Sequence, residues 1–427
     1  MDKFDVVVVG GRVAGSTLAS LLGVQGFKVL LLDRTSFPSD TLSTHVIYGD
    51  SFGIWERLGA WETIQSFGSA KLWGISWIRD GRPDIRGRFW PVRGHDYSLC
   101  IRRILLDDAL FHHAANIPGV TAIQGARVTD LLQEGSRVNG VRFETRDQHG
   151  VMKESTASAR LVAGCDGRRS LVAKVVGAPQ YITEPPINFA FYTYVGGVDT
   201  GPEPEPMFEI WDSDPVGGTP MLAECDAGIW MVIVYLPQAQ FDSFRQNKDE
   251  NFWKAMDSDP RVGPRLRSGT QLQPIKGAGD FVNFVREPVG DGWALIGDAG
   301  QHKDPIFGQG IGDAVRSAEL LADCMVEAES EGSDLDSALA RFRLKRDLDL
   351  VPNFQWMIQG RPTDMTETDF TTIFDGLGTD SEQAERFVNL FSHAVSGTEF
   401  FGRLNASRLL GREPAAFDTR QLAVRDD

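Results

Sequence analysis

The residues with the clearest chemical signal are glycines that follow a short apolar run near the N terminus. The segment Gly10-Gly11-Arg12-Val13-Ala14-Gly15 follows Val6–Val9 and matches the dinucleotide-binding pattern G-x-G-x-x-G except at Arg12. The second glycine of that pattern lets the backbone approach a pyrophosphate without a Cβ atom in the way. Asp33 lies about twenty residues further on, where an acid binds ribose hydroxyls. The spacing therefore predicts a dinucleotide site in which the Cβ atom of Arg12 tilts away from the phosphates.

Two other segments contain groups suited to acid–base chemistry. His45 lies in "DTLSTHVI" (40–47), and its two interpretations are contact with a cofactor or substrate, or capping and packing at the start of a helix. His302 and Asp304 lie in "LIGDAGQHKDPIFGQGIGDA" (295–314), where each is either an acid–base group or a structural residue. We keep both interpretations open for each of these side chains.

Regular elements must position these residues. Residues 5–34 show the pattern of a strand, a glycine turn, a helix and a second strand, and residues 98–115 that of a short strand entering a helix. The alternation and turn signals of residues 120–144 predict a β-meander. Residues 159–170 predict a strand that ends at a glycine turn, and residues 293–328 predict a strand, a loop and a long helix.

The pattern changes between residues 187 and 274. Long aromatic strands are predicted at "INFAFYTYVGGV" (187–198) and "GIWMVIVYLP" (228–237), and a helix at 241–256. This is the pattern of a sheet inserted into the first domain. The remaining C-terminal part is predicted to be mostly helical.

Composition limits the partners and the compartment. The 427 residues carry a net charge of −16, which argues against nucleic acid and anionic membranes as partners. No apolar run approaches the roughly 18 to 20 residues of a membrane span, and the chain enters its first strand without a basic leader. The adjacent His112 and His113 lack the spacing of a metal site, so no metal is predicted. We expect a soluble, cytoplasmic protein with reduced thiols at Cys100, Cys165, Cys225 and Cys324. The composition predicts no oligomeric state.

Further motifs resemble those of a known family. "GCDGRRS" (164–170) resembles the aspartate–glycine motif, and residues 295–314 the glycine–aspartate motif, of FAD-dependent aromatic monooxygenases of the p-hydroxybenzoate hydroxylase type. "RRILLDDAL" (102–110) resembles the R-x-x-L-D-x-x-L helix of the same group. The resemblance covers residues 3 to about 350, in the family's order.

The resemblance implies non-covalent FAD and a role for several side chains. Asp33 is expected to bind the adenosine ribose, and Arg103 to supply a cation to the diphosphate or ribityl region. Asp298 is expected at the ribityl and pyrophosphate side, and Pro305 beside the isoalloxazine. Asp166 is expected near the flavin end, where the transient donor NAD(P)H approaches. The implied cofactor residues are Gly10, Gly11, Arg12, Gly15, Asp33, Arg34, His45, Arg103, Val128, Asp166, Asp298, Pro305, Gly308, Gly310 and Ile311. The candidate catalytic residues are His45, His302, Asp304 and Pro305.

Two positions depart from the family pattern. Gly312 stands where the family usually has Asn, so a side-chain contact to the flavin is missing or replaced. Arg12 stands where the family has glycine, and its guanidinium can fold back over the dinucleotide or over the neighbouring helix.

The resemblance also implies the architecture. We expect an α/β protein with a split Rossmann-like FAD-binding domain, an inserted antiparallel β-sheet substrate domain and a C-terminal helical region. The expected FAD-binding parts are residues 1–75, 98–180 and 275–350; the expected substrate-binding parts are the excursion 76–97 and the sheet 181–274, and the helical region is 351–427.

The activity implied is that of an NAD(P)H-dependent FAD monooxygenase. In such enzymes O2 adds at the flavin C4a carbon, and the resulting hydroperoxide passes one oxygen atom to an electron-rich organic substrate. The aromatic content favours a hydrophobic, aromatic or polycyclic substrate. That this substrate belongs to secondary metabolism is a separate hypothesis, which the residues do not test. The residues that could line its pocket, or form plain sheet core, are Trp73, Trp77, Phe191, Tyr192, Tyr194, Trp211 and Trp230.

Three alternatives remain. A flavin-dependent halogenase shares the cofactor domain, but its W-x-W-x-I signature has a different spacing from Trp73-Gly-Ile-Ser-Trp77. A flavin oxidoreductase of the geranylgeranyl reductase type also fits the motifs. A carrier or scaffold that keeps the FAD fold without redox turnover is the alternative from another class.

Overall fold

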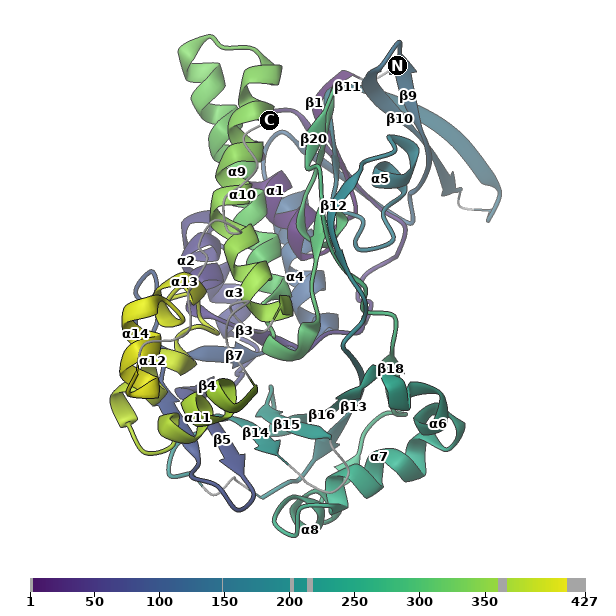
Figure 1. Ribbon diagram of the computed structural model, residues 1–427. Helices are drawn as coiled ribbons and strands as arrows, with labels where there is room; N and C mark the ends of the chain where they lie inside the picture. The colour runs from purple at the N-terminus through teal and green to yellow at the C-terminus, as the bar shows by residue number, and fades with distance from the viewer. Residues whose placement is uncertain (1–2, 148, 200–202, 213–217, 360–366, 413–427) are drawn as a thin grey trace.

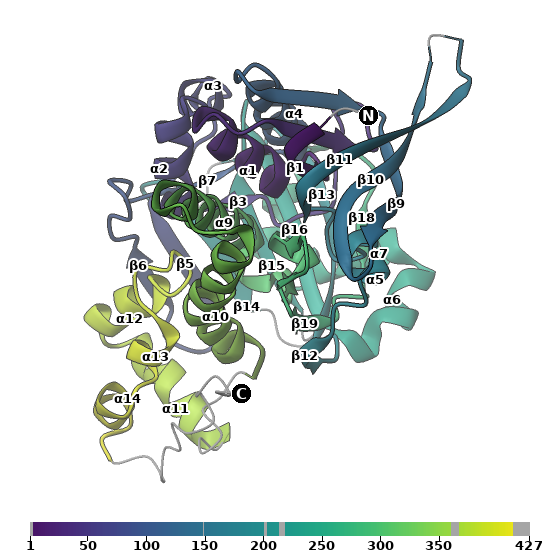
Figure 2. The same cartoon turned by 90° about the horizontal axis from the view of Figure 1, so that it is seen from above.

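The glycine loop belongs to a sheet with a parallel centre, drawn in the upper part of Figure 1. The computed structural model describes residues 3–147, 149–199, 203–212, 218–359 and 367–412. The strands of this sheet are β1 (Lys3–Val9), β2 (Val29–Asp33), β8 (Val120–Gln124), β9 (Arg127–Glu134), β10 (Arg137–Arg146), β11 (Met152–Gly164), β20 (Val289–Gly290) and β21 (Trp293–Leu295). Their order is β20–β21–β11–β1–β2–β8, and β10 and β9 extend from β11 in antiparallel pairs. The β10–β11 hairpin reaches away from the body of the molecule (Figure 2).

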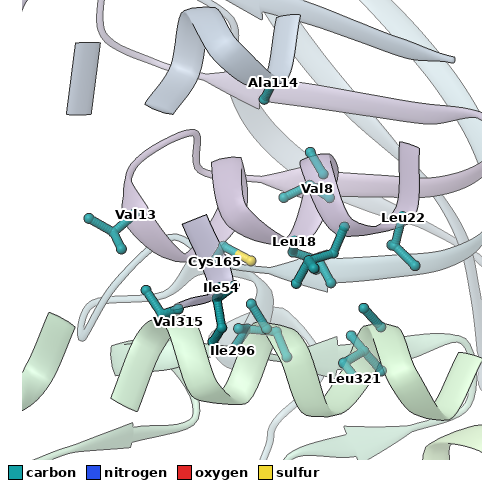
Figure 3. Close-up of a cluster of buried hydrophobic side chains, with 14 of the residues drawn as sticks. Val8, Val13, Leu18, Leu22, Ile54, Ala114, Cys165, Ile296, Val315 and Leu321 are labelled. Atoms are coloured by element: carbon teal, nitrogen blue, oxygen red, sulfur yellow. The ribbon is translucent and has the colours of Figure 1, made fainter. Parts of the chain in front are cut away.

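Helices bury one face of this sheet. They are α1 (Val13–Val24), α4 (Arg103–Ala115) and α9 (Gly310–Glu331). Val8 of β1, Leu18 of α1 and Val315 of α9 belong to one buried cluster, in which α1 lies between the strands and α9 (Figure 3). Val7 and Val9 point to the opposite face and pack into a second cluster with residues of β9 and β10. Burial of both faces explains why β1 is apolar without interruption.

A second sheet carries the aromatic strands. Its strands are β5 (Gly74–Arg79), β6 (Ile85–Arg88), β13 (Asn188–Gly196), β14 (Phe208–Asp212), β15 (Thr219–Glu224), β16 (Ile229–Pro237), β17 (Thr270–Gln271) and β18 (Lys276–Ala278). The order is β17–β13–β16–β15–β14–β5–β6, and β18 also pairs with β13. The pairs are antiparallel except β14 with β5, which is parallel. Strands that lie more than a hundred residues apart in the sequence thus share this sheet.

The two faces of the second sheet have different covers. On one face Phe189, Phe191 and Val234 pack against α6 (Phe241–Gln246), α7 (Lys248–Asp257) and α8 (Val262–Arg267). The other face carries Tyr192 and Ile233, which belong to a cluster shared with the C-terminal helices. The single helix predicted at 241–256 is wrong in one respect: the backbone leaves the helical region at Asn247, so α6 and α7 are separate.

The C-terminal helices are α10 (Leu335–Gln359), α11 (Glu367–Leu377), α12 (Ser381–Val388), α13 (Gly397–Phe400) and α14 (Arg403–Leu410). Helix α12 packs against β6, whereas α10 packs along α9 (Figure 1). The remaining elements are α2 (Gly49–Leu58), α3 (Trp61–Gln65), α5 (Leu171–Val175), β3 (Val46–Ile47), β4 (Lys71–Leu72), β7 (Ser98–Cys100), β12 (Gln180–Glu184), β19 (Asn283–Arg286), β22 (Gln301–His302), η1 (Gln238–Gln240), η2 (Gly297–Ala299) and η3 (Pro305–Phe307). Strand β7 lies between β3 and β4, and β19 lies between β12 and β22.

The predicted fold class is confirmed, with a second local correction beside that at 241–256. The strand–turn–helix–strand pattern at 5–34 and the strand–helix pattern at 98–115 are present. The meander at 120–144 is wrong in its first strand, because β8 pairs in parallel with β2 instead of antiparallel with β9. A helical crossover through α4 brings β8 to that edge, as parallel pairing requires. The domain limits given above stay a prediction.

Two further properties of the described residues concern membrane spans and cysteines. None of the helices found in them is long and apolar enough to cross a membrane. The cysteines in the described chain are all free and buried.

Candidate functional site

A cavity of about 850 Å³ lies where the two sheets face each other. The implied cofactor residues that line it are Gly10, Arg12, Asp33, Arg34, Arg103, Val128, Asp166, Asp298, Pro305, Gly308, Gly310 and Ile311. Gly11, Gly15 and His45 lie outside its lining. Of the other candidate catalytic residues, His302 lines it and Asp304 does not. The cavity thus collects residues from distant parts of the sequence into one concave surface.

The glycine loop has a geometry that only glycine allows at two positions. Gly10 has φ of +102°, and a Cβ atom there would lie 2.4 Å from the carbonyl oxygen of Cys165. A Cβ atom on Gly15 would lie 1.8 Å from the carbonyl oxygen of Gly10. The loop therefore passes close to β11 and opens α1 with its N-terminal amides beside the cavity, which is the arrangement that binds a pyrophosphate.

Asp33 both holds this loop and faces the cavity. One carboxylate oxygen accepts a hydrogen bond from the Gly11 amide at 2.6 Å, and the other accepts from the amide and the hydroxyl of Thr35 at 2.7 and 2.6 Å. A carboxylate has about four lone-pair directions, so these three bonds leave capacity for a ribose hydroxyl. The position suits the ribose role that the sequence pattern indicates.

Arg12 and Arg103 share one buried carboxylate. Both guanidinium groups pair with Asp107 of α4, whose side chain is fully buried. Arg12 also donates to the carbonyl and the hydroxyl of Ser39 at 3.2 and 3.1 Å, and to the Asp40 carbonyl at 3.3 Å. Of the two orientations left open above, Arg12 adopts the one toward the neighbouring helix. The hydrogen bonds of Arg12 thus go to protein groups, and Arg103 is the cation at the cavity wall that suits a diphosphate.

Asp166 presents an unused oxygen in this lining. One of its carboxylate oxygens accepts from the amides of Leu171 and Val172 at 2.6 and 3.3 Å. The other oxygen is buried and has no hydrogen-bond partner among the described residues. Burial raises the pKa of Asp166 above its ordinary value, and the hydrogen bonds oppose that rise. A ligand that donates a hydrogen bond would satisfy this oxygen.

The loop between η2 and α9 separates the candidate acid–base residues. His302 lines the cavity, and its ring Nδ1 atom is 2.8 Å from the Val282 carbonyl oxygen, to which it donates. Asp304 instead caps η3 by accepting from the Ile306 amide at 3.1 Å, and it also accepts from the amide and the side chain of Asn188. Burial raises the pKa of Asp304. Asp304 therefore fixes the loop to the start of β13.

A lysine that the sequence analysis did not select lies between these two residues. Lys303 is buried at the cavity wall, and its Nζ atom is 2.8 Å from a carboxylate oxygen of Asp313 and 2.9 Å from the Gln309 side-chain oxygen. Gln309 in turn donates to the carbonyls of Leu390 and Phe391. These bonds fasten the loop to the C-terminal region. The only sequence signal was the place of Lys303 inside the matched motif.

His45 is buried outside the cavity lining. Its backbone has φ of +66°, its Nδ1 atom donates to the Ser43 carbonyl at 2.6 Å, and its Nε2 atom accepts from the Tyr194 hydroxyl at 2.5 Å. Burial, assisted by the charge of Arg103, lowers its pKa to about 4. The ring is thus a neutral group that joins the segment before β3 to the second sheet. This geometry favours the packing interpretation over direct substrate contact.

Two hydroxyl groups meet at the carbonyl of Pro305. The Thr44 hydroxyl lies 2.8 Å from this oxygen and the Tyr235 hydroxyl 3.1 Å, and the two hydroxyls are 2.8 Å from each other. Thr44, Tyr235 and Pro305 all line the cavity. Sequence analysis did not select Thr44 or Tyr235, because their partner lies at least 70 residues away in the chain.

The aromatic residues considered for a substrate pocket do not line this cavity. Phe191, Trp211 and Trp230 lie in the cluster under α6–α8, on the far face of the second sheet. Tyr192 and Tyr194 face the other way but lie outside the lining, as do Trp73 and Trp77. The cavity lining takes the apolar residues Ala190 and Ile233 from the second sheet, and Phe281 from the segment between β18 and β19. The interpretation as sheet core therefore fits most of the aromatic set.

The residues present fit FAD. The backbone at Gly10 and Gly15 leaves no room for side chains, the cation of Arg103 suits a diphosphate, and the free oxygen of Asp166 suits a hydroxyl donor. Within the described residues, no group of three or more His, Cys, Asp or Glu side chains is placed to hold a metal ion.

We expect Asp298→Ala to weaken FAD binding by about 10- to 100-fold, the range for loss of a charged hydrogen bond. Asp298 belongs to η2 and lines the same cavity as the glycine loop. Equilibrium dialysis of the holoprotein, followed by denaturation to release and quantify FAD, measures the effect. Asp336→Ala removes an exposed carboxylate on α10 and is the matched control. An Asp298→Ala protein with the parent's affinity would contradict the assignment.

Comparison with known proteins places this site among flavoproteins. A family model described as "FAD binding domain" matches residues 3–341. The chain is 23% identical over 360 residues to a 1H-pyrrole-2-carbonyl-[peptidyl-carrier protein] chlorinase of Pseudomonas fluorescens, covering 76% of each chain. It is 28% identical to a tryptophan 2-halogenase of Chondromyces crocatus, covering 78% of this chain and 63% of the relative. It is 26% identical to a 6-methylpretetramide 4-monooxygenase of Streptomyces rimosus, covering 79% and 80%.

Solved structures share the fold. The flavin-dependent brominase Bmp2 superimposes with a TM-score of 0.79 at 18% identity, covering 96% of this chain and 98% of that one. The protein PqsL of Pseudomonas aeruginosa, described as a probable FAD-dependent monooxygenase, gives 0.67 at 18% identity, covering 91% and 100%. Halogenases and monooxygenases thus share this architecture, and the fold alone does not distinguish their reactions.

Proposed function

Because the chain belongs to the FAD-binding domain family, a family of flavoenzymes, we propose that it is an FAD-dependent monooxygenase. The proposed substrates are NAD(P)H, O2 and a hydrophobic, aromatic or polycyclic small molecule. FAD, when bound, supplies the passage of electrons from NAD(P)H to O2 and the delivery of one oxygen atom to the organic substrate. The protein supplies binding, orientation and exclusion of water.

The continuity of the cavity carries this proposal. Gly10, Asp33 and Asp298 line one part of it, and Ile233 and Tyr235 of the second sheet line another part of the same space. A substrate resting on the second sheet would therefore share one continuous cavity with the cofactor. Direct transfer of an oxygen atom requires such contact, because the reacting atoms must be held close together.

The lining residues divide this work between them. Leu42, Ile233 and Phe281 provide an apolar surface that excludes water from the substrate side. The hydroxyls of Thr44 and Tyr235 are polar groups beside Pro305, and they would orient a substrate relative to the loop between η2 and α9. Burial keeps the pKa of Tyr235 above its ordinary value, so this hydroxyl remains protonated at neutral pH.

A halogenase is the second candidate, because the chlorinase and the tryptophan halogenase are among the relatives. Against it, Trp73 and Trp77 have a spacing different from the halogenase signature. Trp73 packs edge-to-face against Tyr97, and Trp77 packs against Phe374 and Phe387. Neither tryptophan lines the cavity. A reductase of the geranylgeranyl type remains an outcome of the test.

The reaction class can be tested on the purified holoprotein. NADPH is added with oxygen-18 gas, with or without bromide and chloride, to 2-naphthol, indole and tryptophan as separate probes. We expect NADPH oxidation that depends on O2 and a product that contains one oxygen-18 atom without any halide requirement. A halogenated product that forms only with halide would favour the halogenase. Substrate reduction under nitrogen would favour the reductase.

A further inference from the structure

We propose that Arg12 is a latch that holds residues 39–44, here named the strap, closed over the cofactor site and thereby sets the rates of FAD uptake and release. Arg12 stands where the motif has glycine, and its contacts are to the protein. The proposal rests on the FAD site described above and deepens it, because it assigns a function to the residue that departs from the pattern.

The strap forms one wall of the cavity. All of its residues line the cavity, from Ser39 to Thr44. Its first residue, Ser39, accepts a hydrogen bond from Arg12 of the glycine loop. Its last residue, Thr44, donates a hydrogen bond to the carbonyl of Pro305 in the loop between η2 and α9. The strap therefore spans the distance between the two loops that would hold the two ends of the dinucleotide. A dinucleotide bound along this wall could leave most readily if the strap moved.

Arg12 holds the beginning of the strap with several bonds. Its guanidinium donates to the Ser39 carbonyl, the Ser39 hydroxyl and the Asp40 carbonyl, and its charge is anchored on Asp107. A planar guanidinium with five N–H donors can make these bonds together, which an ammonium cannot. The guanidinium also lies over the ring of Phe37, 5.7 Å from its centroid. These partners are all protein groups, so the bonds form with the strap closed whether or not a phosphate is nearby.

A second contact holds the strap from the opposite side. The Asp40 carboxylate is 3.0 Å from the Nζ atom of Lys276 on β18, and it accepts from the Tyr192 hydroxyl at 3.4 Å. Lys276 is half exposed and does not line the cavity. A change at Lys276 can therefore loosen the strap without removing any contact to FAD.

The two possible functions of Arg12 predict different kinetics. If Arg12 bound the pyrophosphate directly, its loss would raise the dissociation rate and the Kd together. If it closes the strap through protein contacts, its loss lowers the barrier in both directions, so association and dissociation accelerate together and Kd changes little.

The experiment compares exchange with affinity on the holoprotein. Excess isotopically labelled FAD is added, and the rate at which bound FAD is replaced gives the dissociation rate; dialysis against a series of FAD concentrations gives Kd. We expect Arg12→Gly and Lys276→Met each to raise the exchange rate about tenfold or more, with Kd changed by less than about threefold. Lys254→Met, an exposed lysine on α7, is the matched control and should exchange at the parent's rate.

Other outcomes overturn the proposal. A Kd that rises in proportion to the exchange rate in Arg12→Gly would make Arg12 a phosphate ligand. An unchanged exchange rate in both Arg12→Gly and Lys276→Met would leave the strap without a kinetic function. If Arg12→Gly does not fold, Arg12→Lys takes its place. Lysine keeps the charge beside Asp107 but lacks the planar set of guanidinium donors, so this variant must exchange FAD faster than the parent. Exchange requires no NAD(P)H or O2, so its result is independent of the reaction class proposed above.

Discussion

Gly15→Ala is expected to yield protein without bound FAD and to lower the free energy of unfolding by about 3 kcal/mol or more, the upper range for overpacking. The added Cβ atom would lie 1.8 Å from the carbonyl oxygen of Gly10 and 3.0 Å from a methyl of Val8. The position of Gly10 is fixed, because its amide donates to the Leu32 carbonyl at 2.8 Å and a Cβ atom on it would already lie 2.4 Å from the Cys165 carbonyl oxygen. Helix α1 must therefore shift away from β1, which opens the loop at the pyrophosphate.

The matched control for this change is Gly376→Ala. Gly376 is also a helical glycine, on α11, and a Cβ atom there would meet nothing within 4 Å. We expect the control to keep FAD and to gain up to about 1 kcal/mol from the better helix propensity of alanine. Urea unfolding and the ratio of bound FAD to protein measure both variants. A Gly15→Ala protein with full FAD content and a stability within about 1 kcal/mol of the parent would refute the close-packing argument.

The features that sequence predicted best are those that depend on neighbouring residues. The loop at Gly10–Gly15 and the acid at Asp33 follow from strand, turn and helix patterns within one short segment. The glycines predict a tightly packed backbone, and the uninterrupted apolar run of β1 predicts a strand that is covered on both faces. The same reasoning was sound for the helix after Arg103, whose apolar positions repeat with helical spacing.

Contacts between distant segments could not be read in this way. Arg12 meets Ser39 and Asp107, which lie 27 and 95 residues away, so its orientation was left between two alternatives. Thr44 and Tyr235 lie 191 residues apart in the chain and meet at the Pro305 carbonyl. Aromatic composition was equally ambiguous, since strand alternation puts residues such as Phe191 on one face or the other, and the sequence does not show which face a helix covers.

His45 illustrates the same limit for a titratable group. Its position after β2 suggested contact with the cofactor or substrate, whereas the ring is fully buried between the Ser43 carbonyl and the Tyr194 hydroxyl. Burial in that place has a cost at acidic pH, because the native ring stays neutral down to a pKa of about 4 while the unfolded chain takes up a proton below about 6.5. The stability that depends on this ring is therefore complete above about pH 6.5 and is lost as the pH falls from 6.5 to 4.

His45→Asn is expected to remove this pH dependence. Asn tolerates the left-handed backbone that His45 adopts, but it does not titrate. At pH 7.5 the variant should be less stable than the parent by about 1 to 3 kcal/mol, because Tyr194 and Ser43 lose their partners. The difference in free energy of unfolding between parent and variant should then fall by about 1.4 kcal/mol at pH 5.5 and by about 3 kcal/mol at pH 4. The first of these pH values is still above the isoelectric point of about 4.9. Urea unfolding of both proteins at these pH values measures the difference.

Tyr194→Phe breaks the same hydrogen bond but keeps the imidazole, so it should be destabilised at every pH and retain the parent's acid sensitivity. A gap between parent and His45→Asn that stays constant from pH 7.5 to 5.5 would show that the native ring takes up its proton as readily as the unfolded chain does.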